Sequence, residues 1–288
     1  MATSLPEVDI TAIQNRIWQA HDIAMDMLRL DLIHPIISGN KYLKLLPYLD
    51  LYRQNACTSV ISYGGAYSNY LHALAYTCYL NNIPCTLVVR GEQVVNDTLH
   101  DCAQWGATIQ FLTRSEFDES CYSSCIADDG ALHIPFGGHD KAGLYGLQEI
   151  LEKIKQSYTH YACSIGTGTT INALISASKK TKAQVLGFMA SKDAKLADAI
   201  AEQGAVVNAE SYAPKFGGIA DNTVQFMLNF YEQQQIKLDM VYTGKMMQAL
   251  HQMIVEQQIP QGARILAIHT GGLQGNRSHA ALRHLTAP

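Results

Sequence analysis

The stretch Ser38-Gly39-Asn40-Lys41 places a lysine directly behind a small, polar turn. Residues of these types begin helices, and apolar side chains then recur at helical spacing as far as Leu49. The sequence therefore predicts a helix whose first turn carries Lys41. A cation is disfavoured at the positive end of a helix macrodipole, so this position favours a neutral, nucleophilic amine. An enzyme needs such an amine to form a Schiff base with a carbonyl compound, although an ordinary solvated lysine is the simpler interpretation of these four residues alone.

The composition is that of a globular protein long enough for two domains. The 288 residues are 48% hydrophobic and 16% charged, with a net charge of −4, which gives no reason to expect a nucleic acid or an anionic membrane as partner. No apolar run could span a bilayer, and the first ten residues lack the pattern of a signal peptide. Seven unevenly spaced cysteines are typical of reduced thiols rather than of a metal site. We therefore expect a cytoplasmic protein without a bound metal.

Predicted strands and helices alternate along most of the chain. Short β-branched or apolar runs bounded by turn residues predict strands at 58–62, 85–89, 108–112, 132–136, 161–165, 184–189, 239–242 and 264–268. Amphipathic runs predict helices at 68–81, 96–106, 142–156, from 169 onward, and at 193–203, 222–235 and 245–257. This alternation predicts an α/β protein whose parallel sheets are covered by helices on both faces.

The chain shows no repeat, low-complexity tract or flexible linker, so a domain border must be a compact crossing of the chain. Such crossings are expected near Tyr52 and Gly143. We therefore predict a large domain built from residues 1–51 and 144–288, and a small α/β domain built from residues 52–143.

Polar, glycine-containing loops follow several predicted strands, at the carboxyl ends where open α/β sheets bind ligands. After the first strand comes Tyr63-Gly64-Gly65-Ala66-Tyr67-Ser68-Asn69, in which two glycines allow close approach of the backbone and Ser68 with Asn69 opens a helix. After the strand 161–165 comes Gly166-Thr167-Gly168-Thr169-Thr170, whose N–H groups, hydroxyls and helix dipole suit a phosphate. A helix cap and a plain Gly-Thr turn are the structural alternatives for these two loops.

Residue spacing excludes the common nucleotide and hydrolase motifs. A Walker motif at Gly244-Lys245 needs a glycine where Asp239 stands and a hydroxyl where Met246 stands. A dinucleotide fingerprint beginning at Gly166 needs a third glycine at the position of Ile171. No Gly-x-Ser-x-Gly or His-Glu-x-x-His sequence is present, so neither a serine hydrolase nor a zinc protease is indicated.

The combination of a helix-start lysine, a Gly-Gly loop ending in Ser-Asn and a Gly/Thr loop resembles one enzyme family. The chain is similar to the 1-aminocyclopropane-1-carboxylate deaminase/D-cysteine desulfhydrase family, whose members are pyridoxal-phosphate enzymes with the tryptophan synthase β fold (fold type II). The resemblance runs from about Ser38 to Gly272, with Lys44-Leu45 continuing the lysine motif. It implies two parallel-sheet α/β domains with pyridoxal 5'-phosphate between them, a cofactor-binding large domain, and a homodimer.

The resemblance also implies a role for each matching residue. Lys41 would carry the cofactor, and Asn69 would hydrogen-bond the ring oxygen of the cofactor. Ser68 would face the carboxylate and Cα of a small amino-acid substrate. Tyr242 matches an active-site tyrosine, and Thr243 matches the partner of the pyridine nitrogen. The cofactor phosphate would be held by Gly166, Thr167, Gly168, Thr169 and Thr170.

Three departures from the family pattern limit what the resemblance implies. Tyr70 stands where a histidine usually follows Ser-Asn. Pro47 lies in the predicted helix of Lys41 and removes a backbone hydrogen bond, which predicts a kink or a restart of that helix. The segment Lys215-Phe216-Gly217-Gly218-Ile219 stands where the family has a second active-site tyrosine, so the clamping of the substrate is left unassigned.

Thr243 and Thr270 distinguish between activities within the family. Deaminases that open the cyclopropane ring resemble one another in having glutamate and leucine at these positions. A carboxylate keeps the pyridine nitrogen protonated and strengthens the electron sink, whereas a threonine leaves the nitrogen largely neutral. Expelling a thiolate from Cβ does not need the stronger sink. The resemblance therefore predicts a β-eliminating lyase acting on D-cysteine or a similar small amino acid, giving pyruvate, ammonia and sulfide. A 1-aminocyclopropane-1-carboxylate deaminase, a D-serine-type dehydratase and a non-catalytic pyridoxal-phosphate or nucleotide binder remain alternatives.

Overall fold

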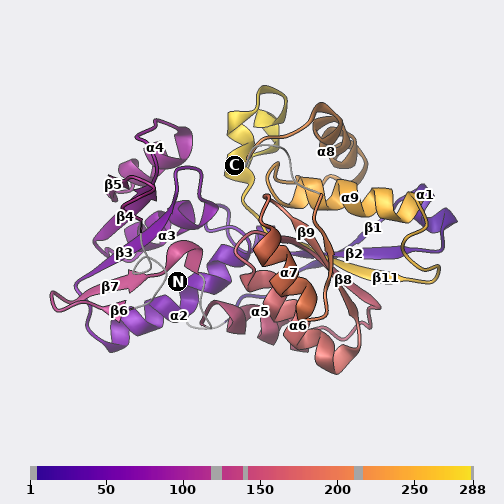
Figure 1. Cartoon of the computed structure of the whole chain (residues 1–288), viewed down its shortest axis with the longest axis horizontal. Coiled ribbons are helices and arrows are strands. Elements are labelled where there is room, and N and C mark those ends of the chain that lie inside the picture. Colours follow the sequence, from indigo (N-terminus) through magenta and orange to yellow (C-terminus); the bar gives the residue numbers. More distant parts are fainter. Residues whose placement is uncertain (1–4, 118–124, 139–141, 211–216, 287–288) are drawn as a thin grey trace.

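The computed structural model describes residues 5–117, 125–138, 142–210 and 217–286, and the strands within these ranges form two sheets (Figure 1). The larger sheet has the order β1-β2-β11-β8-β9-β10, and its neighbouring strands are parallel except for the antiparallel pair β1 and β2. Its strands are β1 (Ile10–Ile13), β2 (Ala24–Arg29), β8 (His160–Ile165), β9 (Gln184–Met189), β10 (Val206–Asn208) and β11 (Arg264–His269).

The smaller sheet has the order β5-β4-β3-β7-β6, and only its edge pair β6 and β7 is antiparallel among the described strands. Its strands are β3 (Ser59–Gly65), β4 (Cys85–Arg90), β5 (Thr108–Leu112), β6 (Cys125–Ile126) and β7 (Ala131–Ile134). Two mainly parallel sheets confirm the predicted fold class. The division into domains at residues 52 and 143 stays a proposal, which is supported by the segregation of the strands into these two sheets.

Helices cover both faces of the larger sheet (Figure 1). On one face lie α1 (Arg16–Ala20), α8 (Asp221–Gln234) and α9 (Thr243–Val255), and on the other lie α5 (Ala142–Lys153), α6 (Thr169–Thr181) and α7 (Ala194–Glu202). The smaller sheet is accompanied by α3 (Asn69–Leu80) and α4 (Asp97–Gln104). Short 3-10 segments complete the chain at η1 (Leu30–Leu32), η3 (Phe136–Gly138), η4 (Leu273–Ser278) and η5 (Ala280–Leu285).

Strand β11 shows how one strand serves two cores. Ile265 and Ala267 belong to the apolar core on the side of α8 and α9, whereas Leu266 and Ile268 belong to the core that continues into the smaller half of the molecule. Successive side chains of a strand point to opposite faces, so a strand in the middle of a covered sheet must be apolar at every position. This explains why β11 is apolar without interruption from Ile265 to Ile268.

Helix α2 (Asn40–Gln54) joins the two halves, because it packs on α5 on one side and on α3 on the other. The helix continues through Pro47, so the predicted restart at this proline is wrong. Tyr42 and Leu43 are buried before the proline, and Tyr48 and Leu49 are buried after it. Packing of both segments in the core therefore holds the helix together despite the hydrogen bond that proline cannot donate.

Two features of the larger half differ from the predicted elements. Residues 239–242 do not form a strand but lead into α9, and β1, β2 and β10 were not expected.

Among the helices in the described part of the chain, none combines the length and apolar character that crossing a membrane requires. The described cysteines are unpaired thiols.

Gly187 in β9 is predicted to control the docking of α6 on the larger sheet. A Cβ atom at this position would lie 2.4 Å from Cδ1 of Ile171 and 2.6 Å from Cδ1 of Ile165. We expect Gly187→Ala to lower the free energy of unfolding by about 1–3 kcal/mol, because the extra methyl overpacks a closed core. Urea unfolding monitored by circular dichroism measures this change. Gly65→Ala is the matched control, since no atom lies within 4 Å of its Cβ position. Equal losses for the two variants would contradict the prediction.

Candidate active site

The predicted site residues come together where the two halves meet. They are supplied by the carboxyl ends of β8 and β11 and by the first turns of α2, α3 and α9. A ring contact links Lys41 to Tyr242, and a hydrogen bond links Asn40 to Thr170. Segments separated by more than two hundred residues are thus brought into one site, as expected at the carboxyl edge of parallel strands.

Lys41 lies in the first turn of α2, two residues after the N-cap residue Gly39. Its Nζ atom donates a hydrogen bond of 2.5 Å to Oδ1 of Asn40 and lies 5.8 Å from the ring centroid of Tyr242. Burial lowers the pKa of Lys41 to about 8, although the negative charge of Asp239 opposes this shift. A substantial fraction of this amine is therefore neutral near physiological pH, which is the form that attacks a carbonyl group.

The turn before Lys41 rests on the turn that follows β11. A Cβ atom on Gly39 would lie 1.8 Å from the carbonyl oxygen of Thr270, and Gly39 has a φ of +74°. A Cβ atom on Gly271 would in turn lie 2.5 Å from Oγ of Ser38. The N–H of Asn40 donates to the same Thr270 carbonyl at 3.3 Å. Only glycine permits this approach, so the start of α2 is fixed relative to the end of β11.

The loop from Gly166 to Thr170 leads into the N-terminus of α6. Gly168 caps this N-terminus with a φ of +86°, and no side chain hydrogen-bonds at the cap. The positive end of a helix dipole favours negative charge at such a position. The Thr167 and Thr169 hydroxyls lie 3.3 Å apart, and Thr170 Oγ1 accepts a 2.7 Å hydrogen bond from Nδ2 of Asn40.

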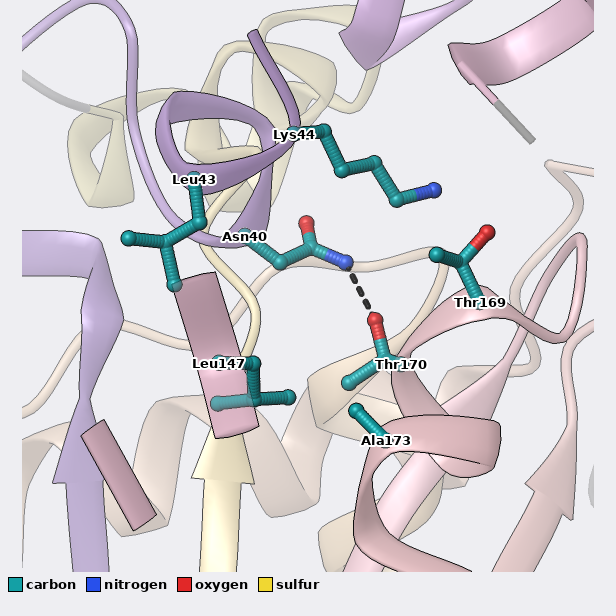
Figure 2. A pocket seen from close by; sticks show the side chains of 7 residues that line it. All are labelled: Asn40, Leu43, Lys44, Leu147, Thr169, Thr170 and Ala173. Atoms are coloured by element: carbon teal, nitrogen blue, oxygen red, sulfur yellow. Dashed lines mark hydrogen bonds between the residues drawn. The ribbon is translucent and has the colours of Figure 1, made fainter. Parts of the chain in front are cut away.

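Lys44 adds a buried ammonium group to this loop. Its Nζ lies 3.2 Å from the carbonyl oxygen of Gly137 and 3.4 Å from Oγ1 of Thr167. Figure 2 shows the side chain of Lys44 extended toward Thr169, above the bond between Asn40 and Thr170. A helix N-terminus together with a cation suits a phosphate group. No role was predicted for Lys44, although its position three residues after Lys41 places both lysines on the same side of the helix.

Asp239 organises the start of α9 and explains why no strand forms there. Its buried carboxylate accepts hydrogen bonds from the N–H groups of Val241, Tyr242 and Thr243 at 3.0, 2.8 and 2.7 Å. These bonds curl the backbone into a helix N-terminus, which overrides the local preference for a strand. The predicted strand at 239–242 is wrong for this reason.

Tyr242 and Thr243 are placed differently by this turn. The Tyr242 ring lies over Gly166, where a Cβ atom would be 3.2 Å from Cε1 of the ring. Burial raises the pKa of Tyr242, so its phenol is neutral. The side chain of Thr243 is fully buried, and its Oγ1 has no hydrogen-bond partner among the described residues. An unpaired buried hydroxyl is costly, so this group suits a polar partner.

Ser68 and Asn69 begin α3 as predicted. Ser68 is the N-cap residue, and its Oγ accepts a hydrogen bond from the N–H of Leu71 at 3.2 Å. The hydroxyl proton of Ser68 is still available to a ligand. Asn69 is buried, and its Oδ1 accepts a hydrogen bond from Nε2 of Gln274. No local pattern predicts a role for Gln274, because its contact with Asn69 spans 205 positions.

Gly64, Gly65 and Tyr70 lie close in sequence to the start of α3. Gly64 and Gly65 end β3 rather than forming a loop, because both pair in register with β4. Tyr70, which replaces the usual histidine, is buried against Gly138, where a Cβ atom would lie 2.7 Å from the Tyr70 ring. The segment expected to carry a second tyrosine falls partly outside the described residues, at Lys215 and Phe216. Within the described ranges, no three or more histidine, cysteine or acidic side chains form a group that could hold a metal ion.

Comparison with known proteins identifies the family. The model of the family described as "Pyridoxal-phosphate dependent enzyme" matches residues 27–271. A Thermotoga maritima protein provisionally named 1-aminocyclopropane-1-carboxylate deaminase is 24% identical over 291 residues, covering 90% of this chain and 92% of that protein. A protein of Oryza sativa subsp. japonica, provisionally named mitochondrial D-cysteine desulfhydrase 2, is 37% identical over 68 residues, covering 24% of this chain and 17% of that protein.

The fold of a crystallised homologue is also similar. The crystal structure described as that of the ACC deaminase homologue superimposes with a TM-score of 0.78 at 21% identity, covering 97% of this chain and 94% of that chain. At this identity the superposition shows the fold, which is that of the tryptophan synthase β group as predicted. The family match covers most of the chain and includes every predicted site residue. The chain belongs to the family of pyridoxal-phosphate dependent enzymes.

Proposed function

We propose that the protein is a β-eliminating lyase acting on D-cysteine or a similar small amino acid. The observation that carries this proposal is the buried, unpaired hydroxyl of Thr243, directly after Tyr242. The family resemblance places the partner of the pyridine nitrogen at this position. A hydroxyl there leaves the nitrogen largely unprotonated, which is sufficient when the leaving group is a thiolate that already accepts charge well.

The residues present fit the cofactor. Thr243 supplies a buried hydroxyl oxygen without a partner among the described residues, and the loop from Gly166 to Thr170 supplies a helix N-terminus without a side-chain cap, beside the amine of Lys44. In this proposal Lys41 attaches the cofactor, Asn69 donates to its ring oxygen, and Gly166, Thr167, Gly168, Thr169 and Thr170 hold its phosphate. When bound, the cofactor withdraws electrons from the substrate Cα, which makes the α-proton acidic.

Lys41 is also the group that we assign to removal of the α-proton. Burial brings its pKa to about 8, close to the pH at which a base both accepts and releases protons readily. Tyr242 is held 5.8 Å from this amine, measured from Nζ to the ring centroid, and stays protonated. Ser68 at the start of α3 is assigned to the substrate carboxylate, where the N-terminus of the helix favours negative charge.

A second candidate is a 1-aminocyclopropane-1-carboxylate deaminase. The provisional name of the Thermotoga maritima relative favours it, since that relative matches over nearly the whole length of both chains. A D-serine-type dehydratase and a non-catalytic binder of the cofactor are the remaining alternatives. We also propose a homodimer in the cytoplasm, which rests on the resemblance and on the composition.

Attachment of the cofactor to Lys41 can be tested directly. Borohydride treatment of the holoprotein should fix the cofactor on Lys41, because this amine is partly neutral and lies beside the anion loop. Peptide mapping by mass spectrometry locates the label, and Lys41→Ala should abolish both the label and turnover. Lys44→Ala is the control: it should keep the label on Lys41 but weaken cofactor binding about tenfold, through loss of a charge-assisted contact. A label on Lys44 or Lys245 in the wild-type protein would overturn the assignment.

The substrate class can be tested with Thr243→Glu. A carboxylate at this position would protonate the pyridine nitrogen, and we expect D-cysteine turnover to fall by about tenfold or more, since a stronger sink diverts the reaction from thiolate loss. The rates are measured with D-cysteine, L-cysteine, D-serine and the cyclopropane amino acid. Thr243→Val is the matched control, because it removes the hydroxyl without adding charge. A wild-type preference for the cyclopropane substrate, or unchanged rates and absorbance in Thr243→Glu, would refute the proposal.

A further inference from the structure

The amide of Asn69 has a defined orientation. Asn69 is the first residue of α3, and its Nδ2 atom lies 2.0 Å from the position that a Cβ atom on Gly272 would take. Its Oδ1 atom is the acceptor of the bond from Nε2 of Gln274. With Nε2 of Gln274 facing Asn69, an Asn69 amide rotated by half a turn would bring two N–H donors together, so this bond disfavours the rotated form. Nδ2 is left as the group that can donate to a ligand, and among the described residues it has no acceptor.

Gln274 is held in place from the other side. It lies in η4, and its backbone carbonyl oxygen accepts a hydrogen bond from Nε of Arg277 at 3.2 Å. Arg277 donates to Oδ2 of Asp101 in α4 at 2.6 Å. Asp101 also contacts Nε2 of His72 at 2.9 Å. Burial opposes ionisation of Asp101, yet the hydrogen bonds from His72 and Arg277 lower its pKa to about 2, so the carboxylate is charged at neutral pH.

Segment η4 is linked to helix α3 at two points. Asn69 and His72 are three residues apart and lie on the same side of α3. The first is bonded directly to Gln274, and the second is reached through Asp101 and Arg277. The segment η4 therefore ties the start of α3 to the end of β11, across the junction of the two halves.

From this geometry we infer that Gln274 is a positioning residue, which fixes the amide of Asn69 so that its N–H group faces the ring oxygen of the cofactor. The inference rests on the cofactor role proposed for Asn69. An anionic ring oxygen needs a donor, and an Asn69 amide in the rotated form would present a carbonyl oxygen instead. Gln274 would thus act on the electronic state of the ring without touching it.

Two substitutions at position 274 separate orientation from packing. Gln274→Met keeps the size of the side chain but cannot donate to Asn69. Gln274→Glu offers only acceptors, so it favours the rotated amide. Gln274 also borders a cavity with Ser38, His72 and Trp105, which leaves room for both replacements. Gln261→Met is the control, since Gln261 is exposed in the turn before β11, at the opposite end of that strand.

The experiment follows the holoprotein without substrate. The measured quantities are the position and pH midpoint of the visible absorbance band, the Kd for pyridoxal phosphate, and the thermal midpoint. We expect Gln274→Met to raise the Kd about three- to tenfold and to shift the band, with a larger shift in Gln274→Glu. Asn69→Ala should shift the band in the same direction as Gln274→Met, and Gln261→Met should change neither the Kd nor the band.

The outcomes distinguish this inference from the proposed function. Wild-type band and Kd in both Gln274 variants, with a shifted band in Asn69→Ala, would overturn the inference and leave the function standing. A lowered thermal midpoint with unchanged band and Kd would also overturn it, because it would show that Gln274 acts on packing alone. An unchanged band in Asn69→Ala would overturn the cofactor role of Asn69 and the inference with it.

Discussion

The site depends on a contact between two backbone turns that leaves no room for side chains. Gly39, before the lysine helix, lies against the carbonyl of Thr270, and Gly271 lies against Ser38. These turns belong to α2 and to the end of β11, which are more than two hundred residues apart in sequence. The buried side chain of Arg29 donates hydrogen bonds of 2.9 and 2.7 Å to the carboxylate of Asp31, in the segment just before this contact. The position of Lys41 is therefore fixed by sterics rather than by its own interactions.

Electrostatics then decide what the fixed lysine can do. Burial disfavours the charged amine, while Asp239 favours it, and the balance leaves the pKa of Lys41 near 8. Asp239 does not make this contribution as a free charge, because three backbone N–H groups already hydrogen-bond its carboxylate. Burial raises the pKa of Tyr242, and the charge of Asp239 raises it further. Burial lowers the pKa of Lys245, and the charge of Asp239 opposes this shift. One capped carboxylate thus affects the protonation of three side chains.

Much of this arrangement could be predicted from the sequence, because it is encoded locally. Strands with buried faces show apolar runs, and Ser68 and Gly168 mark the starts of α3 and α6 as expected for capping positions. The predictions that were wrong concern features that tertiary contacts decide. Residues 239–242 read as a strand until the carboxylate of Asp239 is seen to bind three N–H groups. Helix α2 was expected to kink or restart at Pro47, yet it continues through this residue, and both flanks of the proline are buried. The contact of Gln274 with Asn69 has no local signature at all.

The central claim is that Lys41 is a partly buried amine whose pKa lies near 8. The pH dependence of cofactor capture by Lys41 tests this claim most directly. The rate at which the apoprotein captures pyridoxal phosphate on Lys41 is measured against pH by borohydride trapping. The same measurement on Nα-acetyllysine gives the midpoint of an ordinary lysine amine. The neutral amine is the reactive form, so the protein rate should rise with pH and level off above a midpoint near 8, well below the ordinary lysine value of 10.5. Asp239→Asn should move the midpoint lower, because it removes the charge that raises the pKa. A midpoint equal to that of the model amine would contradict the account.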